Sequence, residues 1–332
     1  MDLSIIILNY KNKNLIKELL KNFAELDLHY KYEIIVVDNN SRDGVEELAK
    51  KFNTKFIQSN KNKGFAGGNN IGINAASGKY IMICNPDLAI LSDAIQVMYD
   101  YMESHPEVGL AGPRLINADK SIQYSCTRFP DWHLPLYRRT SLGNSNKGQA
   151  WLDNYLMKDS DHSQNFFTPA LFGACMIIRQ SALEKVGLLD ERYFMYMEDL
   201  DWSRRFWENN YKVSYIGQAE IIHLHRRESA ESNIFKSLFA KSARYHIFSF
   251  LKYLKKFKGK DLPELYVKTR EKLLAYEAET KKEVREVIKE LGHLGNILGD
   301  SIQLDSIPTN YFLLLGQSVS SEVIPSKEEQ GD

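Results

Sequence analysis

The chain contains little cysteine and no excess of charge. Its 332 residues include three cysteines, none in a CxxC pair, and 43 basic residues balance 43 acidic ones. An odd number of scattered cysteines favours a reducing compartment over a disulfide framework. Because a balanced charge gives no overall attraction to nucleic acid, we expect no nucleic-acid partner.

Long apolar runs are also missing. No stretch approaches the ~20 residues that cross a bilayer. No basic segment with an apolar core precedes the first apolar run, at residues 3–8, so we expect no signal peptide and a cytoplasmic location. Hydrophobic residues still make up 43% of the chain, which is ample for a buried core.

The first hundred residues alternate between apolar runs and helical patterns. Strands are expected at 3–9, 33–38, 54–58 and 80–84, and helices at 12–24, 42–52, 67–76 and 92–104. Continuous apolar runs are typical of parallel strands buried on both faces. The alternation predicts an α/β fold with a doubly wound, mostly parallel sheet. Ligands bind at the carboxyl ends of such strands, where Asn9, Asp38 and Asp87 stand.

The rest of the chain changes character twice. Residues 113–170 are rich in Pro, Gly, Asn and aromatic side chains, which predicts loops and short strands, and a buried strand is expected within 168–178. Between Ser232 and Lys260 there is no acidic residue, while lysines and aromatics accumulate. The predicted organisation is a main domain over 1–232, a helical extension over 233–300 and a partly disordered tail over 301–332.

Three carboxylates stand within four residues in Glu198-Asp199-Leu200-Asp201, followed by Trp202. Like charges crowded beside apolar side chains have perturbed proton affinity, as a general base requires. The helix dipole favours acids at a helix N-terminus, but three of them exceed what capping needs. We therefore predict a helix over 198–209 that carries a catalytic carboxylate. Arg205, four residues beyond Asp201, can pair with it.

Two earlier segments could hold a nucleotide. The glycine-rich segment 60–70, with Gly64, Gly68 and Asn69, precedes a helix, and glycines let backbone amides approach a phosphate. Its spacing is neither a Rossmann fingerprint nor a P-loop. The segment Asp38-Asn39-Asn40-Ser41 could bind a base or ribose, or could be turn and cap chemistry.

Further residues could hold a metal. Asn85-Pro86-Asp87 follows a predicted strand and could offer a carboxylate to Mg²⁺ or Mn²⁺, or could simply end the strand in a turn. His223 and His225 alternate along a predicted strand over 220–224, so they point to one face. One could be a metal ligand, although a histidine on a strand is often structural.

Taken in order, these residues resemble those of family 2 glycosyltransferases with the GT-A fold, especially bacterial rhamnosyltransferase-like members. The resemblance runs from about Leu3 to Arg227. The segments that carry it are 4–10, 36–41, 60–70, 85–87, 173–174, 198–202 with Arg205, and His223.

The resemblance implies a role for each motif. Asp199 is expected to be the catalytic base. Asp87 is the expected metal ligand, since Asn85 departs from the first position of the family's Asp-x-Asp motif, and His223 or His225 is expected to help hold the cation. The expected donor-binding residues are Asn9, Asp38, Asn40, Gly64, Gly68, Asn69 and Asn85. The expected acceptor-side residues are Gly173, Ala174, Glu198, Asp201 and Trp202.

The implied reaction is inverting transfer of a sugar from a nucleotide-diphosphate donor to a glycan or lipid-linked acceptor in cell-surface polysaccharide synthesis. Rhamnose on thymidine diphosphate is the first expectation; other hexoses, and galactofuranose on uridine diphosphate, stay open. The cofactor is expected to be Mg²⁺ or Mn²⁺. The alternatives are a nucleotidylyltransferase that makes a nucleotide sugar and a catalytically silent binding module.

Two further contacts are expected from the extension. The basic, aromatic segment 235–260 could lie on an anionic membrane at its inner face, or could pack as ordinary helices on the main domain. A charged helix over 264–298 has apolar residues at 3–4 spacing, so it could pack on the domain or pair two copies of the chain into a homo-oligomer.

Overall fold

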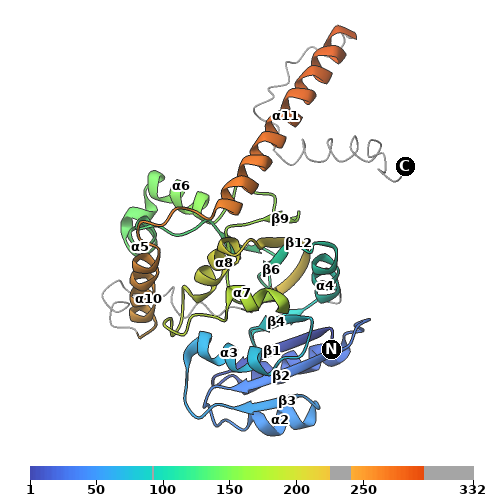
Figure 1. The fold of residues 1–332 in the computed structure, drawn as a ribbon, viewed down its shortest axis with the longest axis vertical. Coiled ribbons are helices and arrows are strands. Elements are labelled where there is room, and N and C mark those ends of the chain that lie inside the picture. Colours follow the sequence, from blue (N-terminus) through green and yellow to red (C-terminus); the bar gives the residue numbers. More distant parts are fainter. Residues whose placement is uncertain (92, 225–240, 295–332) are drawn as a thin grey trace, which may run out of the picture. The chain divides into compact units, whose positions relative to one another are not determined.

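The computed structural model describes residues 1–91, 93–224 and 241–294 (Figure 1). It divides into two compact units, Met1–Leu265 and Tyr266–Asp332. The division comes later than the predicted boundary at 232, because helix α10 (Lys241–Phe257) belongs to the first unit. His225 and the predicted tail over 301–332 lie outside the described residues.

One mixed sheet forms the centre of the first unit. Its strands follow the order β3-β2-β1-β4-β11-β6-β12-β5. Their bounds are β1 Leu3–Asn9, β2 Tyr32–Asp38, β3 Lys55–Gln58, β4 Tyr80–Cys84, β5 Leu88–Ile90, β6 Val108–Ile116, β11 Cys175–Arg179 and β12 Lys212–His223. The four strands from β3 to β4 run parallel, and β11 lies antiparallel between β4 and β6. The parallel half therefore brings the carboxyl ends of β1, β2 and β4 to one edge, as predicted.

Helices connect the parallel strands in the predicted order. They are α1 Lys13–Glu25, α2 Val45–Lys51, α3 Gly64–Ala75 and α4 Ala94–Ser104. In α1, Ile16, Leu19, Leu20 and Phe23 recur at helical spacing and are all buried. Helix α3 has several glycines and so a weak intrinsic tendency to be helical, but its buried face packs on β1 and β2. Tertiary packing therefore stabilises this helix.

The middle of the chain differs from the prediction. Residues 113–170 contain two helices, α5 (His133–Arg139) and α6 (Asn146–Tyr155), where loops and short strands were expected. Ser145 caps α6 by accepting a hydrogen bond from the Gly148 backbone at 3.1 Å. The short strands of this region are β7 Ile122–Gln123, β8 Cys126–Thr127, β9 Phe166–Phe167 and β10 Ala170–Leu171. Some of the aromatic side chains that suggested loops, namely Tyr137, Trp151 and Tyr155, belong instead to these two helices.

The C-terminal part of the first unit also differs in detail. The strand predicted within 168–178 is split into β10 and β11. Strand β12 begins at Lys212, well before the strand predicted over 220–224, and its pairing with β6 is irregular between Ile216 and Glu220. Two 3₁₀ segments (Ser141–Asn144 and Gln180–Ala182) and helices α7 (Leu183–Val186) and α8 (Glu198–Glu208) complete this part.

The extension contributes two helices. Phe250, Tyr253 and Phe257 of α10 share an apolar cluster with Met197 and Leu200, on either side of the start of α8. Helix α11 (Glu264–Leu294) follows, and the pairing of two chains through it stays a prediction. Among the described residues, no helix has the length and apolarity that a bilayer span requires.

Candidate active site

The carboxyl ends of β1 and β2 form the first part of the site. Asn9 and Asp38 are direct neighbours across the two strands, and both side chains are buried. The Asn9 amide donates to Asp38 Oδ1 at 2.8 Å and to Asp43 Oδ1 at 3.0 Å. Two of the predicted donor-binding residues therefore meet, and Asp43 joins them, although no sequence signal pointed to it.

Asp38 is surrounded by hydrogen-bond donors. Its carboxylate accepts from the backbone N–H groups of Ser41 and Arg42 and from Gln58 Nε2 at 3.0 Å. Burial alone would raise the pKa of the Asp38 carboxyl, but the hydrogen bonds from Ser41, Arg42 and Gln58 bring it below its usual range. Asp38 is therefore a fixed anion at neutral pH.

The glycine-rich segment lies beside this pair of strand ends. Asn39 accepts from the Lys63 backbone at 2.8 Å and donates to the Gly64 carbonyl at 3.0 Å. Gly64 has φ +75°, and a Cβ there would stand 2.0 Å from the Phe194 carbonyl oxygen. A Cβ on Gly68 would stand 2.5 Å from the Leu8 side chain. Glycine is thus required at position 64, whereas a side chain at position 68 would displace the end of the Leu8 side chain.

Two predicted donor-binding residues carry unpaired acceptors. Among the described residues, the Oδ1 atoms of Asn40 and Asn69 are buried without a hydrogen-bond partner. Asn40 also has φ +65°, in the left-handed region. A buried acceptor left unsatisfied destabilises the fold by roughly 1–3 kcal/mol. A donor group on a bound ligand would remove that penalty.

Asp87 and His223 meet beyond the end of β4. The distance from His223 Nε2 to Asp87 Oδ2 is 3.3 Å, and His223 Nδ1 contacts Gln123 Oε1. If Nδ1–H donates to the Gln123 oxygen, Nε2 of the neutral ring is an acceptor, and it faces another acceptor, the Asp87 carboxylate. Only a proton or a cation between these two atoms makes the contact favourable. A carboxylate and an imidazole nitrogen both suit a divalent cation.

The described residues include no group of three or more His, Cys, Asp or Glu side chains able to hold a metal. A cation at Asp87 and His223 would therefore take its remaining ligands from diphosphate oxygens and water, which is how Mg²⁺ commonly binds. Gln123, which orients His223, was missed by sequence reasoning because it lies on the short strand β7, 100 residues away.

The acidic run stands at the start of α8. Tyr196 and Met197, immediately before it, have φ of +71° and +70°. Asp199 Oδ2 accepts from the Gly173 backbone at 2.9 Å, and Oδ1 accepts from the Leu200 backbone at 2.9 Å. Asp199 is half-buried and Glu198 is buried. Two consecutive left-handed residues turn the chain into the helix, whose first turn places Asp199 against Gly173.

The three carboxylates differ in environment. Burial raises the pKa of the Asp199 carboxyl, and hydrogen bonds from Gly173 and Leu200 limit that rise. Burial, and then the charge of Asp199, raises the pKa of Glu198 well above its usual range, and its Oε2 has no hydrogen-bond partner in the described structure. Asp201 is fully buried and pairs with Arg205 at 2.8 Å. Asp199 is the member of the run that combines partial exposure with raised proton affinity.

The segment Gly173–Ala174 connects the parts of the site. The Asn85 N–H donates to the Ala174 carbonyl at 2.9 Å, while the Gly173 N–H binds Asp199. A Cβ on Gly173 would stand 3.2 Å from the Phe65 ring. The segment that bears Asp87, the start of α3 and the acidic run therefore converge here. Trp202, by contrast, is fully buried and donates to the Gly187 carbonyl at 2.9 Å, so its contacts are with the protein interior.

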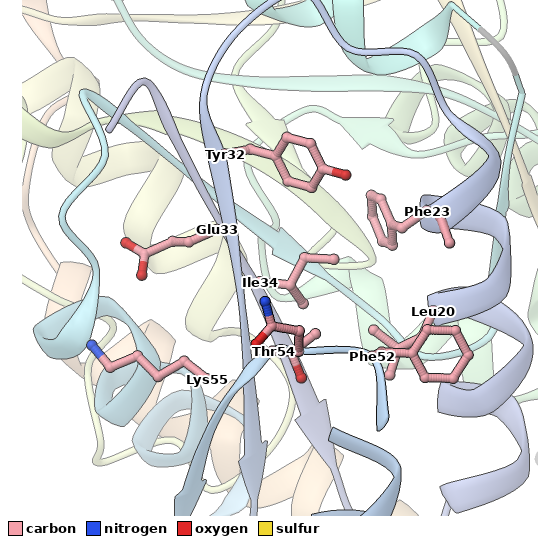
Figure 2. Close-up of a pocket in the computed structure, with 10 residues that line it drawn as sticks. Leu20, Phe23, Tyr32, Glu33, Ile34, Phe52, Thr54 and Lys55 are labelled. Carbon is pink, nitrogen blue, oxygen red and sulfur yellow. The ribbon is translucent and has the colours of Figure 1, made fainter. Parts of the chain in front are cut away.

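A separate groove lies at the other end of the sheet (Figure 2). Its volume is about 470 Å³ and its lining includes Tyr32 and Lys55, the first residues of β2 and β3. Phe23 of α1 and Phe52, which follows α2, complete its apolar side. None of the predicted site residues lines it, and it opens at the amino ends of the strands.

Solved structures establish the class of fold. The structure aligns with a mannosyltransferase from Pyrobaculum calidifontis at a TM-score of 0.51 and 16% identity, covering 96% of this chain and 80% of that one. It aligns with GalNAc-T7 at a TM-score of 0.56 and 13% identity, covering 77% and 48%. The predicted GT-A glycosyltransferase fold is thereby confirmed.

The family follows from the sequence. The chain belongs to glycosyl transferase family 2, whose model matches residues 4–187. It is 28% identical over 240 residues to the low-salt glycan biosynthesis hexosyltransferase Agl10 of Haloferax volcanii, covering 71% of this chain and 70% of that one. It is 27% identical over 258 residues to the rhamnosyltransferase WbbL of Escherichia coli, covering 75% and 91%. The predicted enzyme class, a hexosyltransferase resembling rhamnosyltransferases, is confirmed.

Proposed function

We propose that this glycosyltransferase moves a sugar from a nucleotide-diphosphate donor to an acceptor hydroxyl with inversion, and that Asp199 is the general base. The observation that carries the proposal is the connection through Gly173 and Ala174. It joins the Asp199 carboxylate to Asn85, two residues before Asp87. An acceptor hydroxyl at Asp199 would therefore lie beside a donor held at the strand ends.

The environment of Asp199 suits this role. A raised pKa makes the carboxylate a stronger proton acceptor, and a base works best when its pKa approaches the working pH. Asp199 would remove the hydroxyl proton as the acceptor oxygen attacks the anomeric carbon. The diphosphate would leave from the opposite face, and no covalent enzyme intermediate is required.

Asp87 and His223 would hold a divalent cation, Mg²⁺ or Mn²⁺. Such a cation acts as a Lewis acid that stabilises charge on the leaving diphosphate. The structures of GalNAc-T7 and of the Pyrobaculum calidifontis mannosyltransferase both contain Mn²⁺. Asp87→Ala should abolish the cation dependence of nucleotide binding, measured by titration with Mg²⁺, Mn²⁺ and chelator. Unchanged dependence in that variant would remove Asp87 from the metal site.

The donor is proposed to be rhamnose on thymidine diphosphate, and the acceptor a lipid-linked glycan. WbbL is named a rhamnosyltransferase, and a Mycobacterium tuberculosis relative, 28% identical over 209 residues, is named an N-acetylglucosaminyl-diphospho-decaprenol L-rhamnosyltransferase. That second match covers 57% of this chain and 66% of the relative.

The test is product analysis with a panel of nucleotide sugars and lipid-linked acceptors. Release of nucleoside diphosphate together with a glycosylated acceptor supports transfer. Release of pyrophosphate from a nucleoside triphosphate and a sugar phosphate would support a nucleotidylyltransferase instead. Binding of partners without either product would favour a silent module.

The exposed face of α10 is proposed to contact an anionic membrane. Phe248 and Leu251 are 56% and 54% exposed, and Arg244 and Lys255 lie on the same helical stripe, also exposed. Phe248→Ser with Leu251→Ser should reduce co-sedimentation with anionic vesicles at low salt. Leu15→Ser, at an exposed leucine of α1, is the matched control. Equal sedimentation of both variants and wild type would oppose this contact.

A further inference from the structure

The loop that precedes the acidic run is held between two helices that are far apart in sequence. On one side, the Phe65 N–H at the start of α3 donates to the Phe194 carbonyl at 2.8 Å. Asn70, also on α3, exchanges hydrogen bonds with the backbone of Leu189 at 2.8 and 3.1 Å. The loop over 189–197 is thus fixed to the glycine-rich helix of the donor side.

On the other side, one face of α10 follows the same loop. Tyr245 stacks on Phe194, with ring centroids 4.7 Å apart. Ser249 Oγ donates to the Met195 carbonyl at 2.9 Å. Lys252 Nζ donates to the Arg192 carbonyl at 2.6 Å. The α10 residues are spaced by four and then three positions, so successive turns of the helix contact successive parts of the loop.

Lys256 completes this row and binds one carboxylate near the start of the loop and another on α8, just beyond its end. Its Nζ lies 2.9 Å from Asp190 Oδ2 and 2.5 Å from Asp201 Oδ1. Asp190 precedes the loop's left-handed residues, Tyr196 and Met197, and Asp201 follows them on α8. The Lys256 ammonium group therefore links Asp190, before the left-handed turn, to Asp201, after it. Asp199 lies between these two residues in the sequence.

We infer that helix α10 completes the active site by bracing the loop over 189–197, and that Lys256 is the positioning residue that holds Asp199 in place. This inference rests on the proposed role of Asp199. It makes the C-terminal helix a part of the catalytic unit. Because backbone left to itself avoids two consecutive left-handed non-glycine residues, the strained turn before Glu198 needs such a brace.

The decisive comparison is Lys256→Met against Lys17→Met in the full chain. Methionine keeps the length and the apolar stem of lysine but removes the ammonium group. Lys17 is an exposed lysine of α1, on a different helix from the proposed membrane face, and serves as the matched control. We expect Lys256→Met to lower kcat by about 10–10²-fold, the scale on which a misplaced catalytic group acts, with little change in nucleotide affinity. Lys17→Met should leave both unchanged.

Two additional variants separate positioning from general stability. Lys256→Arg retains a cation and should recover most of the lost kcat. Asp190→Asn releases only one end of the loop and should lower kcat in the same direction, which keeps the test available if Lys256→Met does not fold. An arginine variant as impaired as the methionine variant, or kcat and nucleotide affinity that fall together, would overturn the inference.

Hydrogen–deuterium exchange gives a readout that does not depend on turnover. Peptides covering 189–197 should exchange faster in Lys256→Met than in Lys17→Met. If wild type transfers no sugar, the proposed function fails while the exchange result still tests the brace. Equal exchange in the two variants would overturn the brace even if the enzyme is active.

Discussion

The site contains two groups of carboxylates, one around Asp38 at the ends of β1 and β2, and the other in the acidic run at the start of α8. Their environments shift the pKa in opposite directions. The Asp38 carboxylate accepts hydrogen bonds from two backbone amides and from two side-chain amides, and its pKa lies below the usual range. Burial raises the pKa of Glu198 and Asp199, with backbone hydrogen bonds to Asp199 only in part opposing it. The difference teaches that the supply of donors decides whether a buried carboxylate is a fixed anion or a proton acceptor.

The clusters also differ in how the chain builds them. Most partners of Asp38 lie within about twenty residues after it, except Asn9 on the adjacent strand. The acidic run has nearby partners in Leu200 and Arg205, but two others, Gly173 and Lys256, come from farther away. One cluster is a local turn at a strand end, and the other is assembled by tertiary packing.

The largest expected effect is that of Asp199→Asn. The amide is nearly isosteric but cannot accept the acceptor's proton, so turnover should fall by about 10²–10⁴-fold. Nucleotide affinity should stay close to that of wild type, because the donor residues lie in the other cluster. Turnover and nucleotide affinity are to be measured together.

The neighbouring carboxylates are the controls for that prediction. Glu198→Gln and Asp201→Asn should retain more turnover than Asp199→Asn, since Glu198 is buried and Asp201 is fully buried and paired with Arg205. Near-normal turnover in Asp199→Asn with an inactive neighbour would assign the base to the wrong carboxylate.

The surroundings of Asp38 could be predicted from the sequence more completely than those of the acidic run. Continuous apolar runs place β1, β2 and β4 within a residue of their observed bounds, and Asn9 and Asp38, which end β1 and β2, meet. Parallel strands converge at their carboxyl ends whatever the details of packing. Asn9 and Asp38 could therefore be brought together before the structure was known.

The rest depends on contacts that leave no local pattern. Gln123 orients His223 from a two-residue strand, and Lys256 reaches Asp201 from a helix 55 residues away. Lys256 belongs to a run of lysines that looks like a solvated or membrane-facing surface. Helices α5 and α6 were missed because their aromatic and small residues carry weak helical periodicity, and packing decides their conformation.

An intermediate effect is expected for Asp38→Asn. Replacing the anion weakens several charge-assisted hydrogen bonds, so the free energy of unfolding at pH 7 should fall by about 2 kcal/mol, with weaker nucleotide binding. A carboxyl with a lowered folded-state pKa adds stability above its unfolded pKa and loses it as the pH falls through the folded value. The stability gap between wild type and variant should therefore close in acid. A gap that persists in acid would mean that steric changes cause it.

The smallest effect, and of opposite sign, is expected for Glu198→Gln. A carboxyl with a raised folded-state pKa adds stability below its unfolded pKa, and that stability is lost as the pH rises through the folded value. The neutral amide avoids this loss, so Tm should match wild type near pH 4.5 and exceed it by a few degrees at pH 8. Glu47→Gln, on the exposed face of α2, is the control and should give no such trend. If Glu198→Gln were less stable than wild type at pH 8, the buried carboxylate would have an unrecognised partner, and the contrast between the two clusters would fail.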